Sequence, residues 1–261
     1  MNVQTQPPRA LPGAMDILGV AVTDASRADA IALVDEALQR RRYTKVAFLN
    51  AHSANTAAED AEFAAVLKTF TVFPDGIGVD IAAKILYGRP FADNLNGTDF
   101  VPALLAAVKR PLVVGIVGAV REHGERATAD LMARMPQHQF VYLNDGYLTP
   151  EEEPGVIRRI EELHPDIVLV AMGVPRQEKW IQTNLDGNSC TVPIAVGALL
   201  DFLSGAVPRA PLLVRRMRFE WVYRLCMEPV RLWRRYLLGN PVFVMRILRQ
   251  KLRGGRWSGV R

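Results

Sequence analysis

The sequence has little that would build a metal centre or a disulfide framework. Its 261 residues include only two cysteines, Cys190 and Cys226, and four histidines. No motif spacing joins the two cysteines, and the histidines do not cluster with them, so a structural zinc site is not expected. We expect both thiols to be free and buried.

Long apolar runs are also missing. A membrane-spanning helix needs about 20 consecutive apolar residues, whereas the longest uncharged run, residues 187–200, is too short and contains Pro193. The first 13 residues are polar and contain prolines, unlike the basic start and apolar middle of a signal peptide. With 49% hydrophobic residues the chain can bury a full core. We therefore expect a soluble, cytoplasmic globular protein.

Three nucleotide-binding motifs are absent. Gly115 and Gly118 flank the sequence Ile-Val, which would let a nucleotide approach, but the dinucleotide fingerprint Gly-x-Gly-x-x-Gly is incomplete. The sequence contains no Walker-type Gly-Lys-Ser/Thr and no Asp-x-Asp pair. These absences disfavour a dehydrogenase, an NTPase and a divalent metal held on a nucleotide diphosphate. If a diphosphate binds, arginines must neutralise it.

The net charge of +5 hides a strong asymmetry. Residues 209–261 contain 14 Lys or Arg and two acidic residues, a net charge of +12, which leaves −7 for residues 1–208. Trp221, Trp233 and Trp257 also lie in the basic segment. Arginines interleaved with aromatic side chains suit an anionic membrane surface or a nucleic acid. We expect an α/β core at 1–208 and a basic, aromatic, helical appendage at 209–261.

Short apolar segments alternate with helical patterns along the body. Between the apolar segments lie stretches with apolar residues at helical spacing, such as Ile31, Val34 and Leu38. Strands that alternate with helices predict an α/β fold, with a Rossmann-like, mostly parallel sheet and helices on both faces. The predicted strands are 15–20, 45–49, 70–73, 112–117, 140–143, 167–171 and 192–196.

Asp75 is the first candidate for a catalytic group. It follows the apolar run that ends at Phe73, and Gly76 follows it before Val79 opens a helical pattern. In open α/β sheets ligands bind at the carboxyl ends of the strands, where glycines let a ligand approach the backbone. The same residues are also compatible with simple turn chemistry, or with Asp75 as a helix cap.

Polar or glycine-bearing segments follow three further predicted strands. Asn50, Asp145-Gly146-Tyr147 and Gly173-Val174-Pro175-Arg176-Gln177-Glu178 each come directly after an apolar run. One such loop would mean little. Because parallel strands end at the same edge of a sheet, several of them predict a ligand crevice at that edge.

Six ordered motifs resemble the WecG/TagA/CpsF glycosyltransferases. They run in the family's order from about Val46 to Tyr236, which makes the resemblance far more specific than any single motif. The motifs are Asp75-Gly76-Ile77-Gly78, Gly97-Thr98-Asp99, Asp145-Gly146-Tyr147, Ala171-Met172-Gly173-x-Pro175-x-Gln177-Glu178, Val196-Gly197-x-x-x-Asp201-Phe202-x-x-Gly205, and Arg209-Ala210-Pro211 followed by Glu220-Trp221-x-Tyr223-Arg224-Leu225.

The resemblance implies an inverting enzyme that moves a sugar from a UDP-sugar onto a polyprenyl-diphosphate-linked saccharide. It implies no cofactor and no metal, and a peripheral position on the inner face of the cell membrane. The segment from Arg231 to Tyr236 is similar to the exopolysaccharide branch that includes the xanthan glucosyltransferase GumM, so glucose is the expected sugar. Transfer of N-acetylmannosamine or its uronic acid, as elsewhere in the family, is the alternative.

The family's proposed base falls on Asp75, and an inverting displacement needs one because the acceptor hydroxyl must lose its proton. Asn50 matches the preceding motif, whereas the threonine that TagA-like members place two residues earlier is Phe48 here. Gln177 matches a glutamine near the reacting centre, or else it is only a polar helix start. The remaining substrate-binding candidates are Gly76, Gly97, Thr98, Asp99, Gly118, Asp145, Gly146, Tyr147, Gly173 and Asp201. Among them, the Gly97-Thr98-Asp99 segment could instead be a helix cap, Asp201 a structural acid and Tyr147 a packing residue.

The basic tail gains a role from the same resemblance. A nucleoside diphosphate leaving group needs fixed positive charge. We expect Arg224 and Arg231, with Arg216, to supply this charge. In this interpretation the tail folds over the crevice at an anionic membrane surface while Trp221 and Trp233 meet the lipid. The alternative is a solvated basic face that only binds anionic lipid.

Two other classes of protein are less compatible with the sequence. A nucleic-acid-binding protein would use the basic tail but does not need the strand-end motifs of the body, so we expect no nucleic-acid partner. A regulator that binds a sugar nucleotide without catalysis would tolerate Asp75→Asn. The sequence leaves the acceptor, the linkage and a possible homo-oligomer open.

Overall fold

The structure is a computed structural model that describes residues 13–211, 214 and 219–254. Within these residues an eight-stranded sheet has the order β1-β2-β4-β3-β8-β7-β5-β6. The β1–β2 pairing is antiparallel and the remaining pairings are parallel. The strands are β1 (Met15–Ile17), β2 (Val20–Val22), β3 (Val46–Leu49), β4 (Thr71–Pro74), β5 (Val113–Gly118), β6 (Gln139–Asn144), β7 (Ile167–Ala171) and β8 (Val192–Ala195).

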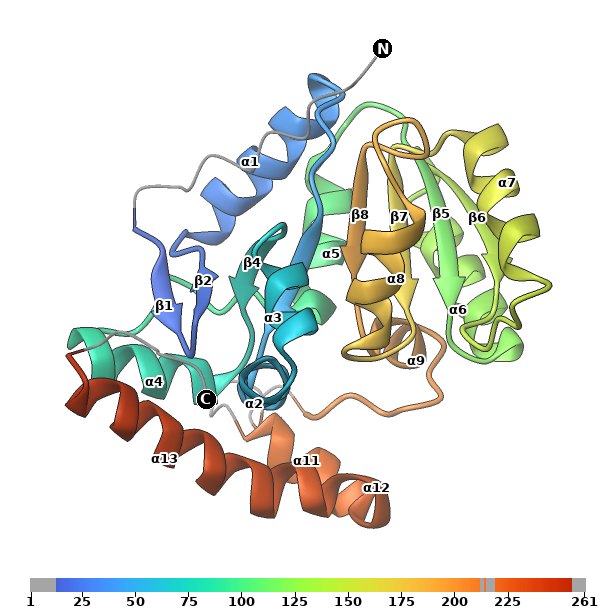
Figure 1. The fold of residues 1–261 in the computed structure, drawn as a ribbon. Coiled ribbons are helices and arrows are strands. Elements are labelled where there is room, and N and C mark those ends of the chain that lie inside the picture. Colours follow the sequence, from blue (N-terminus) through green and yellow to red (C-terminus); the bar gives the residue numbers. More distant parts are fainter. Residues whose placement is uncertain (1–12, 212–213, 215–218, 255–261) are drawn as a thin grey trace.

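Helices cover both faces of this sheet, as Figure 1 shows, so the predicted α/β architecture is confirmed. The helices of the body are α1 (Arg27–Gln39), α2 (Ala51–Glu59), α3 (Ala61–Leu67), α4 (Ile77–Tyr87), α5 (Gly97–Ala107), α6 (Arg121–Arg134), α7 (Glu153–Leu163), α8 (Arg176–Asn184) and α9 (Leu199–Leu203). The C-terminal region forms α11 (Glu220–Met227), α12 (Pro229–Trp233), the π-helix η1 (Arg234–Leu238) and α13 (Gly239–Leu252).

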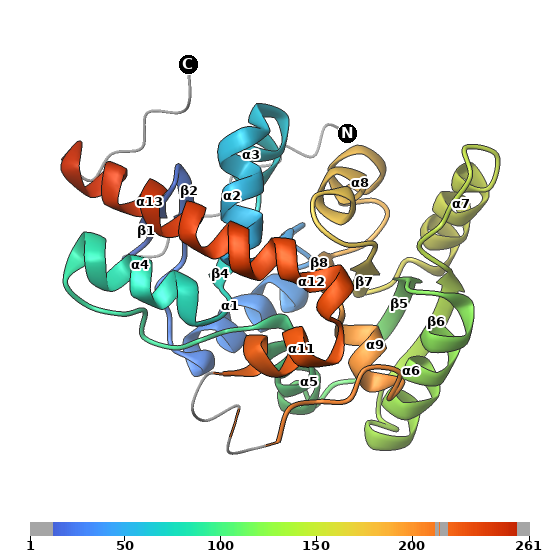
Figure 2. The same cartoon turned by 90° about the horizontal axis from the view of Figure 1, so that it is seen from below.

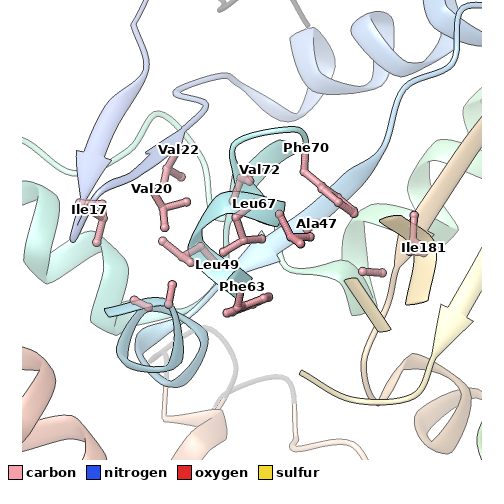
Figure 3. Packing of buried hydrophobic residues seen from close by; sticks show 14 of the residues in the cluster. Ile17, Val20, Val22, Ala47, Leu49, Phe63, Leu67, Phe70, Val72 and Ile181 are labelled. Carbon is pink, nitrogen blue, oxygen red and sulfur yellow. The ribbon is translucent and has the colours of Figure 1, made fainter. Parts of the chain in front are cut away.

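The core consists of two apolar clusters, one on each face of the sheet. Successive residues of a strand point to opposite faces, and in β3 Ala47 and Leu49 belong to one cluster while Val46 and Phe48 belong to the other. The first cluster includes side chains of α2, α3, α4, α7, α8 and α13, and Figure 3 shows part of it. The second includes side chains of α1, α5, α6 and α9. Because both faces are covered, the central strands β3, β8, β7 and β5 consist of apolar residues along their whole length.

The neighbouring strands β3 and β8 form the switch point of the fold. The helix that follows β3, α2, packs into the first cluster, whereas the helix that follows β8, α9, packs into the second. The two chain segments therefore leave the sheet toward opposite faces. A crevice opens at such a point, outside the carboxyl ends of the strands.

Three details differ from the sequence-based expectation. The predicted strand at 15–20 is a hairpin, because Leu18 and Gly19 take positive φ values of 53° and 85° and reverse the chain. The Ala-rich segment that ends at Lys68, whose composition predicts one helix, is split at Asp60, whose Oδ1 accepts a hydrogen bond from Phe63 N and caps α3. Cys190 is buried as predicted, whereas Cys226 is exposed.

The C-terminal helices lie beneath the carboxyl edge of the sheet, with α13 running under α4 and α2 (Figure 1). Phe243 and Ile247 of α13 are buried in the first cluster. Gln250 is fully buried, accepts from Leu18 N at 3.0 Å and donates to Asp16 Oδ1 at 2.7 Å. The predicted division of the chain at residue 208 stays a prediction, and α13 packs tightly on the body.

Candidate active site

A cavity of ≈ 480 Å³ lies at the carboxyl ends of β3 and β4 and is closed by the C-terminal helices. Figure 2 shows this side of the molecule from below, with the C-terminal helices α11, α12 and α13 in front of the sheet. The walls of the cavity come from three regions of the sequence. The loops after β3 and β4 contribute Asn50, His52, Asp75 and Gly76; the segment entering α5 contributes Asn94, Asn96, Thr98 and Asp99; and the later elements contribute Phe202, Phe219, Glu220, Trp221, Arg224, Arg235, Tyr236, Asn240, Phe243 and Val244.

Asp75 is the first residue beyond β4. Its backbone N–H still donates to Leu49 O at 2.9 Å, so the sheet pairing fixes where the side chain starts. Gly76 has φ +87°, a conformation that favours glycine, and donates its N–H to Asn94 Oδ1 at 2.9 Å. This turn ends the strand and starts α4, which leaves the Asp75 carboxyl in the wall of the cavity.

Asn50 connects the loop after β3 to the Asp75 carboxyl. Its Oδ1 accepts from His52 N and Ser53 N, both at 3.1 Å, and thereby caps α2. Its Nδ2 donates to Asp75 Oδ2 at 3.2 Å. The Asn50 amide therefore holds both the start of α2 and the Asp75 carboxylate in place.

Burial raises the pKa of Asp75 above its ordinary value. The hydrogen bond from Asn50 and the positive charges of Arg235 and Arg224 lower that pKa, and the charge of Asp99 raises it. A carboxyl group with a raised pKa holds an abstracted proton more firmly, which suits a general base.

We expect the acidic limb of the pH profile of kcat/KM to report this carboxyl. A base works only when deprotonated, so activity falls as the pH drops through the raised pKa of Asp75. Asn50→Ser keeps a good helix cap but removes the Nδ2 donor that lowers the pKa. The limb should therefore move to higher pH in this variant with little change in melting temperature. An unshifted limb would contradict this role for Asn50.

Arg224 of α11 and Arg235 of η1 bring positive charge to the cavity. The Nε atom of each is buried and makes no hydrogen bond to any described residue. Arg224 stacks on Phe202, with its Cζ 5.2 Å from the ring centroid, and Arg235 stacks on Tyr236 at 5.6 Å. Burial lowers the pKa of Arg235, but a guanidinium stays charged in proteins. Two positioned guanidinium groups with free donors form a site for a di-anionic group.

The other two tail arginines are placed differently. Arg231 is exposed, does not line the cavity, and pairs at 2.8 Å with Glu228, the residue that precedes α12. Arg216 lies outside the described residues. Their predicted roles at the diphosphate remain predictions, and Arg235 is the cavity arginine that the sequence reasoning missed.

Within the motif 97–99, Thr98 and Asp99 line the cavity, whereas Gly97 does not. Asp99 Oδ1 accepts from Arg209 Nη2 at 2.6 Å, which ties the segment before α11 to the start of α5. A Cβ on Gly97 would lie 2.9 Å from Cε2 of Phe48, so this glycine makes room for the ring. Its predicted substrate contact is untested, and the packing explains the glycine without it.

We expect Gly97→Ala to destabilise the protein by about 1–3 kcal/mol, because the added methyl overpacks the site against Phe48. Thermal unfolding measures this loss. Gly155→Ala is the matched control, since a Cβ there meets nothing within 4 Å. Phe48→Thr in the Gly97→Ala background should restore part of the stability. Lost activity at unchanged stability would instead favour a substrate contact for Gly97.

A second group of predicted residues gathers at the ends of β5, β6 and β7. Gly118 packs against the Ala171 backbone, and a Cβ on Gly146 would lie 3.3 Å from the Gly118 Cα. Asp145 Oδ1 accepts from Tyr147 N at 2.9 Å, and the Tyr147 side chain is 69% exposed. These residues, with Gly173, lie along the same sheet edge but outside the cavity lining.

Two further candidates make contacts within the protein. Asp201 Oδ1 lies 3.0 Å from His123 Nδ1, which joins α9 to α6. Gln177 is buried, and both ends of its amide bond to protein groups, Gly197 and Glu178. Neither lines the cavity, and their contacts with substrate remain predictions.

His52, Trp221 and Tyr236 line the cavity although the sequence analysis assigned them no role there. Burial and the charge of Arg235 lower the pKa of His52 to about 4, so its ring is neutral at physiological pH. Trp221 and Tyr236 pack together, with ring centroids 5.8 Å apart. Trp221 stands in the last of the matched motifs and Tyr236 at the end of the segment that begins at Arg231, whereas no quoted motif contains His52. Among the described residues, no group of three His, Cys, Asp or Glu side chains could hold a metal ion.

The fold and the cavity together define an α/β protein with a carboxyl group and two guanidinium groups in one cavity at the carboxyl ends of its strands. The chain matches the model of the "Glycosyl transferase WecG/TagA/CpsF family" over residues 15–256, and it belongs to that family. It is a glycosyltransferase. Similar proteins occur in Staphylococcus aureus strains MRSA252, MW2 and NCTC 8325, each 34% identical over 182 residues, 69% of both chains. Each is named N-acetylglucosaminyldiphosphoundecaprenol N-acetyl-beta-D-mannosaminyltransferase.

Proposed function

We propose that this enzyme transfers N-acetylmannosamine from its UDP-sugar onto N-acetylglucosamine linked to a polyprenyl diphosphate. The names of the Staphylococcus aureus relatives support this sugar and this acceptor. They favour the alternative of the sequence analysis over glucose transfer in exopolysaccharide synthesis, which rested on the tail segment alone. The observation that carries the proposal is that the Asp75 carboxyl lines the same cavity as two half-buried arginines, Arg224 and Arg235, whose Nε atoms make no hydrogen bond to any described residue.

The proposed reaction is a single displacement with inversion. The Asp75 carboxylate takes the proton of the acceptor hydroxyl as that oxygen attacks the anomeric carbon of the donor. The bond from that carbon to the diphosphate breaks, and UDP leaves with its electron pair. Arg224 and Arg235 meet the negative charge that develops on the diphosphate, which stabilises the transition state. The hydrogen bond from Asn50 holds the Asp75 carboxylate in position to take that proton.

A radiolabelled transfer assay tests the proposal. UDP-N-acetylmannosamine and UDP-glucose are offered separately, in EDTA, with polyprenyl-diphosphate-linked N-acetylglucosamine as acceptor. We expect label in the lipid fraction from UDP-N-acetylmannosamine and little from UDP-glucose. The reverse preference would restore glucose as the donor, and a requirement for added divalent cation would overturn the metal-independent mechanism.

The acceptor lipid places this reaction at a membrane, and we extend the proposal to a peripheral position on the cytoplasmic face. None of the helices formed by the described residues is long and apolar enough to cross a bilayer. The C-terminal helices nevertheless expose large apolar side chains beside arginines. The most exposed are Val230 (90%), Leu252 (87%), Leu237 (55%), Leu238 (55%) and Met227 (52%). Apolar side chains flanked by Arg231, Arg234 and Arg249 suit an anionic lipid surface.

We expect the double variant Val230→Asp/Leu237→Asp to bind anionic vesicles at least about tenfold more weakly, because burying one such side chain is worth about 1.5–3 kcal/mol. Cosedimentation with vesicles that contain phosphatidylglycerol measures the binding. Met132→Asp is the control, since Met132 is 46% exposed but lies on α6. Equal loss in the control, or no loss in the double variant, would argue against this surface.

A further inference from the structure

Glu178 and Gln177 form a buried polar pair at the start of α8. Only 1% of the Glu178 surface and 2% of the Gln177 surface are exposed. Gln177 Nε2 donates to Glu178 Oε1 at 2.8 Å, and Gln177 Oε1 accepts from Gly197 N at 3.0 Å. The orientation of this amide is unambiguous, because the Gly197 N–H can only donate and so requires the oxygen.

Folding stability gives no reason for a carboxyl group at position 178. The second oxygen of Glu178, Oε2, is buried and makes no hydrogen bond to any described residue. Burial raises the pKa of Glu178 to about 7. A desolvated carboxyl that accepts only from Gln177 and from its own backbone N–H is destabilising relative to an apolar side chain of similar size. What the residue does provide is an acceptor that fixes the Gln177 amide.

The Gln177 amide fixes the turn between β8 and α9, and α9 forms part of the cavity wall. Gly197 follows β8 and has φ +56°, and the next helix, α9, begins two residues later at Leu199. Phe202 of α9 lines the cavity, and the guanidinium of Arg224 lies over its ring. Contacts therefore run without a break from Glu178 through Gln177 and Gly197 to α9, and from Phe202 to Arg224.

We propose that Glu178 is a positioning residue of the active site, which acts through Gln177 and the β8–α9 turn to place Phe202 and Arg224 for the diphosphate. This inference rests on the proposed function, since it takes the ligand of Arg224 to be the UDP diphosphate. The proposal gives the two residues of the motif separate roles. Gln177 supports the wall of the cavity, and Glu178 fixes the Gln177 amide.

A double-mutant cycle on UDP binding, measured by calorimetry, tests the proposal. Glu178→Leu removes the acceptor and should weaken UDP binding about fivefold or more, because the Arg224 guanidinium loses its support. In the Arg224→Ala background the same change should weaken binding by less than about twofold, since its route to the ligand is already gone. Glu178→Gln keeps an acceptor oxygen for Gln177 Nε2 and should bind UDP within about twofold of the wild type.

Trp180→Phe provides the matched control, because it removes a hydrogen bond of 2.7 Å from the same helix to Glu153 without touching Gln177. It should leave UDP binding unchanged. Should Glu178→Leu not fold, Gln177→Met replaces it in the cycle with the same expected pattern. Equal losses in both Arg224 backgrounds, or unchanged binding in Glu178→Leu, would overturn the proposal.

Failure of the proposed function would look different. A folded wild type that neither binds UDP nor transfers sugar from a UDP donor would reject the proposed function, and this inference with it. UDP binding and transfer by the wild type, with additive losses in the cycle, would reject the inference alone. Hydrogen exchange of the Gly197 amide adds a readout without ligand: it should be at least about tenfold faster in Glu178→Leu than in Glu178→Gln.

Discussion

Asp75→Asn is expected to lower kcat for sugar transfer by about 10²–10⁴-fold, the range that a positioned general base contributes. Asparagine keeps the size of the side chain and can accept a hydrogen bond from Asn50, but it cannot take the proton of the acceptor hydroxyl. Because Arg224 and Arg235 remain in place, affinity for UDP should change little. Single-turnover transfer of radiolabelled sugar measures the loss, and calorimetry measures UDP binding.

Asp16→Asn is the matched control for this substitution. Burial also raises the pKa of Asp16, and its carboxylate also accepts from an amide side chain, that of Gln250. It lies outside the cavity lining, so its substitution should leave transfer unchanged. A fully active Asp75→Asn enzyme would exclude Asp75 as the base.

Arg235→Ala is expected to have the second largest effect, a loss of about 10²–10³-fold in kcat, comparable to the removal of one donor from an oxyanion site. The Arg235 guanidinium is partly buried at the cavity and has a free Nε donor. It should stabilise the leaving diphosphate more in the transition state than in the bound donor. The loss should therefore appear mainly in kcat, with a smaller change in KM.

Arg234→Ala separates this role from the general basicity of the tail. Arg234 is the preceding residue, is exposed, and stacks on Trp233 at 5.3 Å outside the cavity. With a detergent-solubilised acceptor, Arg234→Ala should keep nearly full activity while Arg235→Ala loses it. Equal losses in the two variants would mean that the tail contributes only non-specific positive charge.

The sequence predicted the architecture well where the signal is local. Alternation of apolar strands and amphipathic helices is a local pattern, and it led to the correct fold class. The order of the strands is not local. Strand β3 lies between β4 and β8, although 142 residues lie between Leu49 and Val192 in the sequence. The pairing that creates the crevice therefore could not be predicted from periodicity.

The candidate site was predicted in part for the same reason. Asn50, Asp75 and Gly76 line one cavity because motifs at strand ends converge at one edge of a parallel sheet. Thr98 and Asp99 reach the same cavity from the start of α5, and Arg224 reaches it from α11. Arg235 was missed because it lies in a π-helix, whose wider turn breaks the 3.6-residue periodicity that assigns a side chain to a face. Arg231 was chosen from the same basic run, but it faces solvent beside Glu228.

The burial of Gln177 and Glu178 also lay beyond the reach of the sequence. Polar residues after Pro175 look like an exposed helix start, and only the contact with Gly197, 20 residues further along the chain, shows that they are inside. The role of Gly97 could not be predicted for the same reason, since the ring beside it belongs to Phe48 of β3, which is distant in the sequence. Local pattern cannot distinguish a glycine that contacts a ligand from one that makes room for a ring.

A crystal structure of the protein with UDP would test the central claim most directly, because the claim is that one cavity joins a base to an anion site. We predict the β-phosphate within hydrogen-bonding distance of both Arg224 and Arg235, with the terminal oxygen directed toward the Asp75 side of the cavity. A diphosphate bound away from both arginines, with the cavity beside Asp75 empty, would contradict the account.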